Sequence, residues 1–100
     1  SNCAYNLIVR VHFDPRKSER NIRERGLSLE AAADFDFDGA WMQTDTRRDY
    51  GETRYVAIGW LGDRLHVRCF AEEPDGIRVI SLRKANSREV ARYAEIKTAD

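Results

Sequence analysis

The sequence predicts an α+β fold, in which an antiparallel β-sheet carries helices mainly on one face, in the order β-α-α-β-β-β-β-α. Two observations support this prediction. Helical patterns occupy residues 14–37 and 86–96, whereas four apolar runs separated by turn residues occupy residues 41–82. The chain has 100 residues, of which 42% are hydrophobic. We therefore expect a single domain that spans residues 1–100.

The first two elements are a strand and a short polar helix. Apolar and polar side chains alternate over residues 7–13, which predicts a half-buried strand. Asp14-Pro15 ends this strand and begins a helix, because Asp can cap a helix and Pro fits its first turn; Gly26 ends the helix. Ile22 is its only aliphatic residue, so we expect apolar residues at its two ends to anchor it.

A second helix is expected from residue 28 to residue 37. Its narrow core face would consist of Leu29, Ala32, Ala33 and Phe37. The four predicted strands follow at residues 41–44, 54–61, 64–70 and 77–82.

Turn and capping residues complete the predicted layout. Gly62-Asp63 predicts a tight hairpin between two strands. Asn86 and Glu89 resemble a capping box that begins the last helix. The buried side of that helix is expected to hold Val90, Tyr93 and Ile96.

Composition excludes several classes of protein. No apolar run approaches the roughly 20 residues that span a membrane, and no export leader is visible, so we expect a cytoplasmic protein without membrane contact. Neither Cys3 nor Cys69 belongs to a metal-ligand pattern, so we expect no metal, no other cofactor and no disulfide. Phosphate-binding loops, Ser/His/Asp triads and paired-carboxylate motifs are absent from the sequence, which excludes the classical hydrolases.

Charge is distributed unevenly along the chain. The 17 basic and 17 acidic residues balance in number. Residues 30–38, however, contain carboxylates and no cation, whereas residues 64–92 are rich in Lys and Arg. Such a separation of charge can guide an anion to one surface.

Three basic side chains alternate along the strand predicted at residues 64–70. Arg64, His66 and Arg68 would share one face of this strand. That face is either an ordinary solvated face or a phosphate-binding track, and both interpretations stay open. Because its Arg neighbours favour the neutral imidazole, His66 is a candidate base.

The last strand ends in a cationic segment. Alternation places one set of its side chains on one face, namely Ile77, Val79, Ser81 and Arg83. Arg83 and Lys84 precede a helix N-terminus, where side chains and backbone N–H groups can bind an anion. An ion pair with Glu52 or Glu89 is the alternative interpretation of Arg83.

Glu52 and Arg54 form a second polar cluster, at the start of a strand. They lie two residues apart and therefore on the same side of that strand. A carboxylate beside guanidinium groups is ionised, so Glu52 is interpreted as a base or as a group that orients Arg side chains. A surface ion pair of little energetic value is the alternative.

Three segments of the chain together resemble the BrnT family, the ribonuclease toxins of BrnT–BrnA type II toxin–antitoxin modules. These segments are FDPRKSERNIRERGLSLEAA, YGETRYVAIGWLGDRLHV and GIRVISLRKANSREVARY. They follow one another at the family's spacing over residues 12–94. The resemblance implies a RelE-like fold, metal-independent RNA cleavage, inhibition by a BrnA antitoxin, and repression of the shared operon by the complex.

The resemblance also implies roles for particular positions. The family's Asp-x-x-Lys-x-x-x-Asn pattern falls on Asp14, Lys17 and Asn21, and its Glu-x-Arg pattern on Glu52 and Arg54. Its last two patterns fall on Arg78, Ile80, Ser81 and Arg83, and on Arg88, Glu89 and Tyr93. Where the family commonly has Lys-His-Gly, this chain has Glu24-Arg25-Gly26.

RNA carries its own nucleophile, the 2′-hydroxyl, so the protein needs only to orient the reacting groups, stabilise charge and transfer protons. We expect Arg83 and Arg54 to bind the phosphate, Glu52 to act as base or to orient Arg, and Lys17 to stabilise charge. Four further residues are expected to bind RNA, with His66 as a substitute acid or base: Arg78, Lys84, Arg88 and His66.

The resemblance implies three partners: RNA, a BrnA-like antitoxin with a ribbon-helix-helix fold, and operator DNA bound only through the antitoxin complex. A homodimer and a heterotetramer with the antitoxin are both compatible with it. Two other functions stay open. One is a non-catalytic module that binds RNA or the ribosome, and the other is a decayed toxin that binds only the antitoxin.

Overall fold

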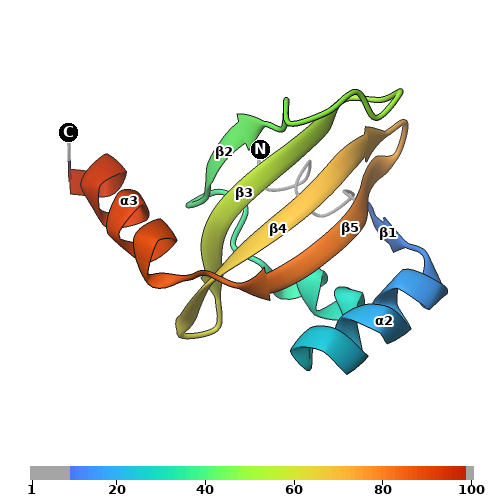
Figure 1. The fold of residues 1–100 in the computed structure, drawn as a ribbon, viewed down its shortest axis with the longest axis horizontal. Helices are drawn as coiled ribbons and strands as arrows, with labels where there is room; N and C mark the ends of the chain where they lie inside the picture. Colours follow the sequence, from blue (N-terminus) through green and yellow to red (C-terminus); the bar gives the residue numbers. More distant parts are fainter. Residues whose placement is uncertain (1–9, 99–100) are drawn as a thin grey trace, which may run out of the picture.

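The computed structural model describes residues 10–98, which form a five-stranded sheet with helices at its side and end (Figure 1). In chain order the elements are β1 (Arg10–Phe13), α2 (Pro15–Arg25), the 3₁₀-helix η1 (Leu29–Asp34), β2 (Trp41–Thr44), β3 (Arg54–Leu61), β4 (Arg64–Glu73), β5 (Gly76–Lys84) and α3 (Ser87–Thr98). The predicted α+β class and element order are confirmed. Residues 7–9 of the first predicted strand lie outside the described residues.

The sheet is mixed rather than purely antiparallel. Its strand order is β1-β5-β4-β3-β2, and β1 pairs with β5 in parallel while the other neighbours are antiparallel. The prediction of an antiparallel sheet is therefore wrong at this one edge. Side-chain alternation predicts that a segment is a strand, but it does not predict which distant strand will be its partner.

Helix α2 has the predicted caps. The Asp14 carboxylate accepts a hydrogen bond from the Arg16 N–H at 2.9 Å, and Pro15 occupies the first turn. Gly26 ends the helix with φ of 72°, a left-handed conformation that favours glycine. Ile22 is 48% exposed, so it does not anchor the helix to the sheet.

Asn21 is the residue that fastens α2 to β5. Its side-chain amide donates hydrogen bonds of 2.8 Å to the carbonyl oxygens of both Leu27 and Leu82. Because β1 pairs with β5 only as far as Val79, the Leu82 backbone lies beyond the end of β1. Asn21 therefore forms hydrogen bonds with backbone groups at the edge of β5 that β1 does not reach. These hydrogen bonds explain why this polar side chain is buried.

The second predicted helix is shorter and tighter than expected. It ends at Asp34, and Phe35 already has an extended backbone. Leu29 and Ala32 are buried as predicted, but Ala33 and Phe37 are exposed, and Phe35 is buried instead. The change in backbone at Phe35 alters which side chains face the sheet, so helical spacing fails beyond this point.

Strand β5 contains a bulge that alternation did not predict. Cys69 pairs with Ser81, whereas its neighbour Phe70 pairs with Val79, so Ile80 is an extra residue opposite β4. Leu82 consequently packs in the same core as Val79. The expected division of β5 into two faces is therefore wrong from the bulge onward.

The two faces of the sheet are covered differently. We call the face that packs against η1 the core face; it carries Ala57, Phe70, Val79 and Leu82. On the opposite face, α3 packs its Tyr93 against Ile58, Leu65, Val67 and Ala85, at one end of the sheet only. In Figure 1, α3 accordingly extends from the end of β5, away from α2. We call the uncovered remainder of this second face the open face.

The capping box that begins α3 is confirmed. The Asn86 side chain accepts a hydrogen bond from the Glu89 N–H at 2.8 Å, and Glu89 accepts one from the Asn86 N–H at 2.9 Å. Tyr93 is buried, as predicted, but Val90 is 39% exposed, contrary to prediction. The tight hairpin at Gly62 is also confirmed, with φ of 65°.

The predicted cationic face of β4 does not exist. His66 is 4% exposed and Arg68 is 3% exposed, so of the three basic residues only Arg64 is exposed. The prediction failed because β4 is central in the sheet and η1 and its following loop cover this face. Among residues 10–98, no helix is long and apolar enough to cross a membrane.

Candidate functional site

The open face carries side chains from three neighbouring strands in register. Cys69 of β4 lies between Val56 of β3 and Ser81 of β5. Val67 lies beside Arg83 in the next row of that face. These residues form the floor and one wall of a pocket of about 450 Å³. Its polar lining comes from α2, β2, the β2–β3 loop, β5 and α3: Arg25, Gln43, Thr44, Asp45, Thr46, Arg47, Ser81, Arg83 and Glu89.

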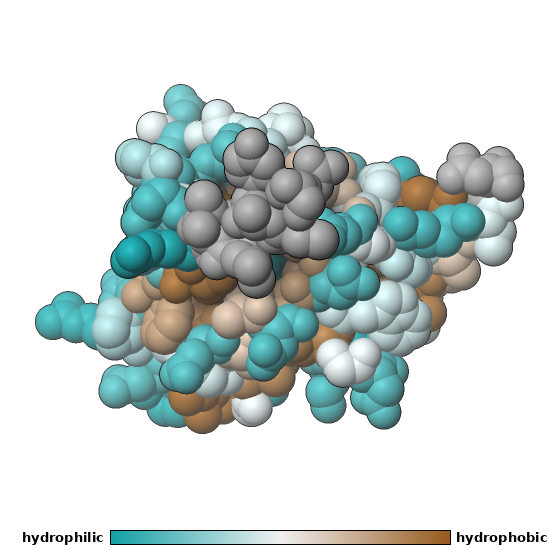
Figure 2. Space-filling view, turned by 180° about the vertical axis from the view of Figure 1, so that it is seen from behind, coloured by the Kyte–Doolittle hydropathy of each residue, from teal (hydrophilic) through white to brown (hydrophobic). Residues whose placement is uncertain are grey.

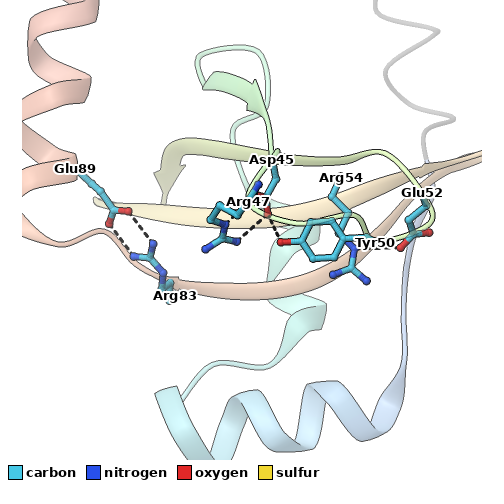
Figure 3. Close-up of polar contacts among 7 residues, drawn as sticks. All are labelled: Asp45, Arg47, Tyr50, Glu52, Arg54, Arg83 and Glu89. Atoms are coloured by element: carbon cyan, nitrogen blue, oxygen red, sulfur yellow. Dashed lines mark hydrogen bonds and ion pairs between the residues drawn. The ribbon is translucent and has the colours of Figure 1, made fainter.

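Arg83 is held at this pocket by Glu89. Two hydrogen bonds of 2.7 Å join its Nη1 and Nη2 atoms to the two carboxylate oxygens of Glu89 (Figure 3). This contact raises the pKa of Arg83 and lowers the pKa of Glu89 below its usual range. The Arg83 side chain remains 36% exposed. The guanidinium is therefore both oriented by the protein and open to an anion.

Asp45 orients a second guanidinium in the same pocket. Its carboxylate accepts hydrogen bonds from Arg47 Nε at 2.9 Å and Nη2 at 2.8 Å, and from the Tyr50 hydroxyl at 3.0 Å. The Asp45 side chain is only 2% exposed, whereas that of Arg47 is 76% exposed. The hydrogen bond from Arg47 holds the pKa of Asp45 well below its usual range. The buried Asp45 carboxylate thus orients the guanidinium of Arg47, which is exposed to solvent.

Tyr50 connects this pair to the cluster around Glu52. The Arg54 guanidinium lies 4.1 Å from the centre of the Tyr50 ring, a cation–π distance. Glu52 accepts hydrogen bonds from Arg54, at 3.1 Å, and from Arg78. Figure 3 shows Glu89 at one end and Glu52 at the other end of this series of polar side chains.

The position of Arg78 depends on the bulge in β5. Simple alternation places Arg78 on the face opposite Arg83. The extra residue Ile80 changes the face on which Arg78 lies relative to Arg83. Ala71 pairs with Arg78 and Cys69 pairs with Ser81, and both pairs lie on the same face of β4. The bulge therefore brings Arg78 to the open face together with Arg83.

Glu52 is bound by two guanidinium groups, which lower its pKa below the usual range, with Arg78 the larger cause. A carboxylate with a lowered pKa is a weaker base. Of the two expected roles of Glu52, the contacts favour the one in which it orients Arg54 and Arg78.

The remaining predicted site residues do not line this pocket. Lys17 lines a smaller neighbouring pocket of about 220 Å³, which shares Arg25 and Ser81 with the first. Lys84 and Arg88 are exposed on either side of the α3 N-terminus. His66 belongs to the other face, and its Nδ1–H donates to the Arg64 carbonyl at 2.9 Å. A role for His66 at this site is therefore a prediction that the structure contradicts.

Asp45 and Arg47 are functional candidates that the sequence reasoning missed. The Asp-x-Arg spacing at the end of β2 was a usable signal, because residues two apart in an extended segment share one side. The burial of Asp45 had no such signal. It depends on the way the loop returns over the open face to Arg54, whose carbonyl accepts from the Asp45 N–H at 2.7 Å.

Comparison with known proteins decides the family. Residues 13–89 match the family described as the ribonuclease toxin BrnT of type II toxin–antitoxin systems. The chain belongs to the BrnT family. The members of this family are ribonuclease toxins, and each acts with an antitoxin partner.

A solved BrnT structure has a similar fold. The 1.1 Å crystal structure of the Brucella abortus ribonuclease toxin BrnT matches this chain with a TM-score of 0.60 and 27% sequence identity. The match covers 79% of this chain and 99% of the Brucella chain. A search among curated proteins found no match.

The BrnT sequence patterns have different physical roles in this member. Asp14 caps α2 and Asn21 fastens it to β5, so both act in the fold. Glu89 both caps α3 and binds Arg83. Arg25 occupies the place of the histidine in the Lys-His-Gly pattern, and it lines the pocket near Ser81 and Arg83. The resemblance implied a histidine at this position, so this chain has a guanidinium where an imidazole was expected.

Proposed function

We propose that this chain is an endoribonuclease that cleaves RNA without a metal ion, by attack of a 2′-hydroxyl on the adjacent phosphate. One observation carries the proposal: two guanidinium groups, Arg83 and Arg47, are each held by a carboxylate at the same pocket. Groups that are oriented in advance stabilise a charged transition state without the cost of reorganisation.

In this mechanism the chain supplies charge and geometry. Arg83, whose side chain is partly exposed, binds the scissile phosphate, and Arg47 approaches the same phosphate from the β2–β3 loop. Arg54 and Arg78 extend the cationic surface along the RNA backbone, and Lys17 stabilises charge from the α2 side. The pentavalent phosphorane carries more negative charge than the phosphodiester, so these contacts strengthen as the transition state forms.

Proton transfer makes a smaller contribution in this proposal. Glu52 and Glu89 both have lowered pKa values and are weak bases. Among residues 10–98, no three His, Cys, Asp or Glu side chains are grouped as a metal site would require. We therefore assign most of the rate enhancement to the oriented cations.

The test is cleavage of RNA by the purified chain, freed of any antitoxin, in excess EDTA. We expect cleavage to continue and to leave 2′,3′-cyclic phosphate ends, which are the product of 2′-hydroxyl attack. Arg64→Ala, on the exposed start of β4, is the control for a nonspecific loss of positive charge. Cleavage that stops on chelation and returns with a divalent metal would refute the metal-independent mechanism.

We propose further that a BrnA-like antitoxin with a ribbon-helix-helix fold neutralises the toxin by covering the open face. The complex, as a heterotetramer, would repress the shared operator. The cationic pocket is complementary to an acidic antitoxin segment, so RNA and antitoxin should compete for it. Simultaneous binding of RNA and antitoxin to the pocket residues, seen by cross-linking, would contradict this proposal.

Arg25 supports a second candidate function, in which the chain binds RNA or the antitoxin without turnover. An arginine cannot replace an imidazole in proton transfer near neutral pH, because the guanidinium group does not release its proton there. Tight RNA binding with no product after prolonged incubation would favour this alternative. In that case Arg25→His should generate activity.

A further inference from the structure

A polar group with unmet bonding capacity, Arg68, lies on the core face, on the opposite side of the sheet from the pocket that contains Arg83. Arg68 is 3% exposed and follows Val67 and precedes Cys69, so strand alternation places it on the face opposite the pocket floor. Its guanidinium carbon lies 4.4 Å from the ring centre of Phe35, 5.0 Å from that of Phe37 and 4.8 Å from that of Phe70. It is a cation enclosed by aromatic rings.

The hydrogen bonds of Arg68 are incomplete. Nη1 donates to the Ala32 carbonyl oxygen at 3.3 Å, and buried Nε has no acceptor. Residues 10–98 provide no carboxylate that forms an ion pair with it. A buried cation without an anion is costly, and here desolvation lowers the pKa of Arg68 to about 10. The three rings offset part of this cost through cation–π contacts. They do not, however, accept hydrogen bonds from N–H groups in the plane of the guanidinium.

A pocket of about 400 Å³ adjoins this guanidinium. Its walls are mainly apolar and come from η1, the loop after it, β1 and β5, including Val11, Ala33, Phe37 and Ile77. Phe37 is 47% exposed. Figure 2 views the molecule from behind, and there apolar surface is exposed between hydrophilic side chains.

We propose that this pocket binds an organic carboxylate that carries an apolar, preferably aromatic, group. The carboxylate would accept hydrogen bonds from the Arg68 guanidinium, and the apolar group would pack against Phe37 and the aliphatic wall. A charge-assisted, two-pronged contact of this kind is the strongest that a buried guanidinium can make.

The acidic residues at the pocket limit which anions can bind. Asp36 and Asp38 also line it, and neither forms an ion pair with Arg68. Both are exposed, so solvent screens their repulsion of an anion at Arg68. A polyphosphate or an RNA backbone, which carries several charges, would be repelled more strongly. A ligand with one carboxylate and an apolar body is therefore favoured.

The experiment is a titration of the full chain with benzoate and phenylacetate, with neutral benzamide as the matched control. We expect saturable binding of each acid at one site, with a higher melting temperature, and no saturable effect of benzamide. The ¹⁵N resonance of Arg68 Nε should shift during the same titration. An equal response to benzamide, or no saturation by either acid, would overturn the proposal.

Two variants test the location of the site. Arg68→Met, which keeps the length of the side chain but removes its charge, should weaken binding of the acids at least tenfold. If this variant does not fold, Ala33→Trp provides the second test, because it fills the pocket from an exposed position and leaves Arg68 in place. The matched control is Arg64→Met, at the exposed first residue of β4, which should bind the acids like the wild type. Unchanged binding in Ala33→Trp would place the ligand elsewhere.

The carboxylate can belong to a free acid or to an acidic side chain of a peptide. A capped peptide that contains adjacent Phe and Glu residues, with a Phe-Gln peptide as its control, separates these sources. If the Phe-Glu peptide binds at least tenfold more tightly than benzoate, the site belongs to a protein partner. If benzoate binds more tightly than the peptide, the site belongs to a free acid. These measurements do not depend on RNA cleavage, so their failure and failure of the proposed ribonuclease activity remain distinguishable.

Discussion

Arg83 and Glu89 are joined by two hydrogen bonds of 2.7 Å, which connect the end of β5 to the first turn of α3. The sequence left open whether Arg83 binds an anion or forms an ion pair. The structure shows the ion pair, and it also leaves Arg83 partly exposed at the pocket. Its pairing with Glu89 holds the guanidinium at the pocket, where we propose that it binds a phosphate.

Arg83→Ala should lower the single-turnover rate of RNA cleavage by about 10²- to 10³-fold, the scale for loss of one oriented transition-state donor. Arg83→Lys should recover only part of the rate, because an ammonium cannot reproduce the planar contact. Loss of the Glu89 pair should cost about 1 kcal/mol of unfolding free energy. Cleavage and thermal melts are measured together, with Arg64→Ala as control. Near-wild-type cleavage by folded Arg83→Ala would show that the residue serves only the fold.

Asp45 and Arg47 should be coupled in catalysis, because Asp45 acts by orienting Arg47. We expect Asp45→Asn and Arg47→Ala each to lower the cleavage rate by roughly tenfold, and the double variant to lose little more than either alone. The measurement is a double-mutant cycle under single-turnover conditions, with Arg48→Ala as control. Additive losses in the double variant would mean that Asp45 does not act through Arg47.

Stability at low pH should depend on Asp45. Its pKa is lower in the folded state than in the unfolded chain, so its contribution is complete above about pH 4 and is lost as the pH falls toward the folded value. The difference in unfolding free energy between wild type and Asp45→Asn should therefore be largest at neutral pH and shrink below about pH 4. Urea unfolding from pH 2 to pH 7 measures this. Asp34→Asn, at an exposed aspartate, is the control; a difference that stays constant with pH would contradict the prediction.

The pH profile of cleavage should lack a histidine step. His66 is buried on the face opposite the pocket, and Arg25 stands where the family pattern has histidine. The single-turnover rate should therefore rise from about pH 6 to pH 8.5 without levelling near 6.5, the usual pKa of histidine. A plateau with an apparent pKa near 6.5 that disappears in His66→Gln would restore His66 as a base.

Asn21→Ala should destabilise the protein without slowing the chemical step. The substitution leaves the Leu82 carbonyl without its side-chain donor in a buried setting, which costs about 1–3 kcal/mol. Urea unfolding and single-turnover cleavage on the folded fraction separate the two effects, and Arg20→Ala on the exposed side of α2 is the control. A large loss of rate in a stable Asn21→Ala protein would instead place Asn21 in the active site.

The sequence by itself determined the elements and the family. Strand alternation, the Asp14 and Gly26 caps, the Gly62 hairpin and the Asn86–Glu89 capping box are local, so nearby residues suffice to predict them. Arg83 was also chosen as a candidate in this way, because the end of a strand and the start of a helix are both visible in sequence.

The tertiary structure alone decided which faces are covered and which distant residues meet. Pairing of β1 with β5, the bulge at Ile80 and the return of the β2–β3 loop over Asp45 all depend on contacts between segments far apart in the chain. Alternation cannot distinguish a solvated face from one covered by η1, so the burial of His66 and Arg68 was not predictable from β4 itself. Burial is a property of two packed layers, and a single strand specifies only one of them.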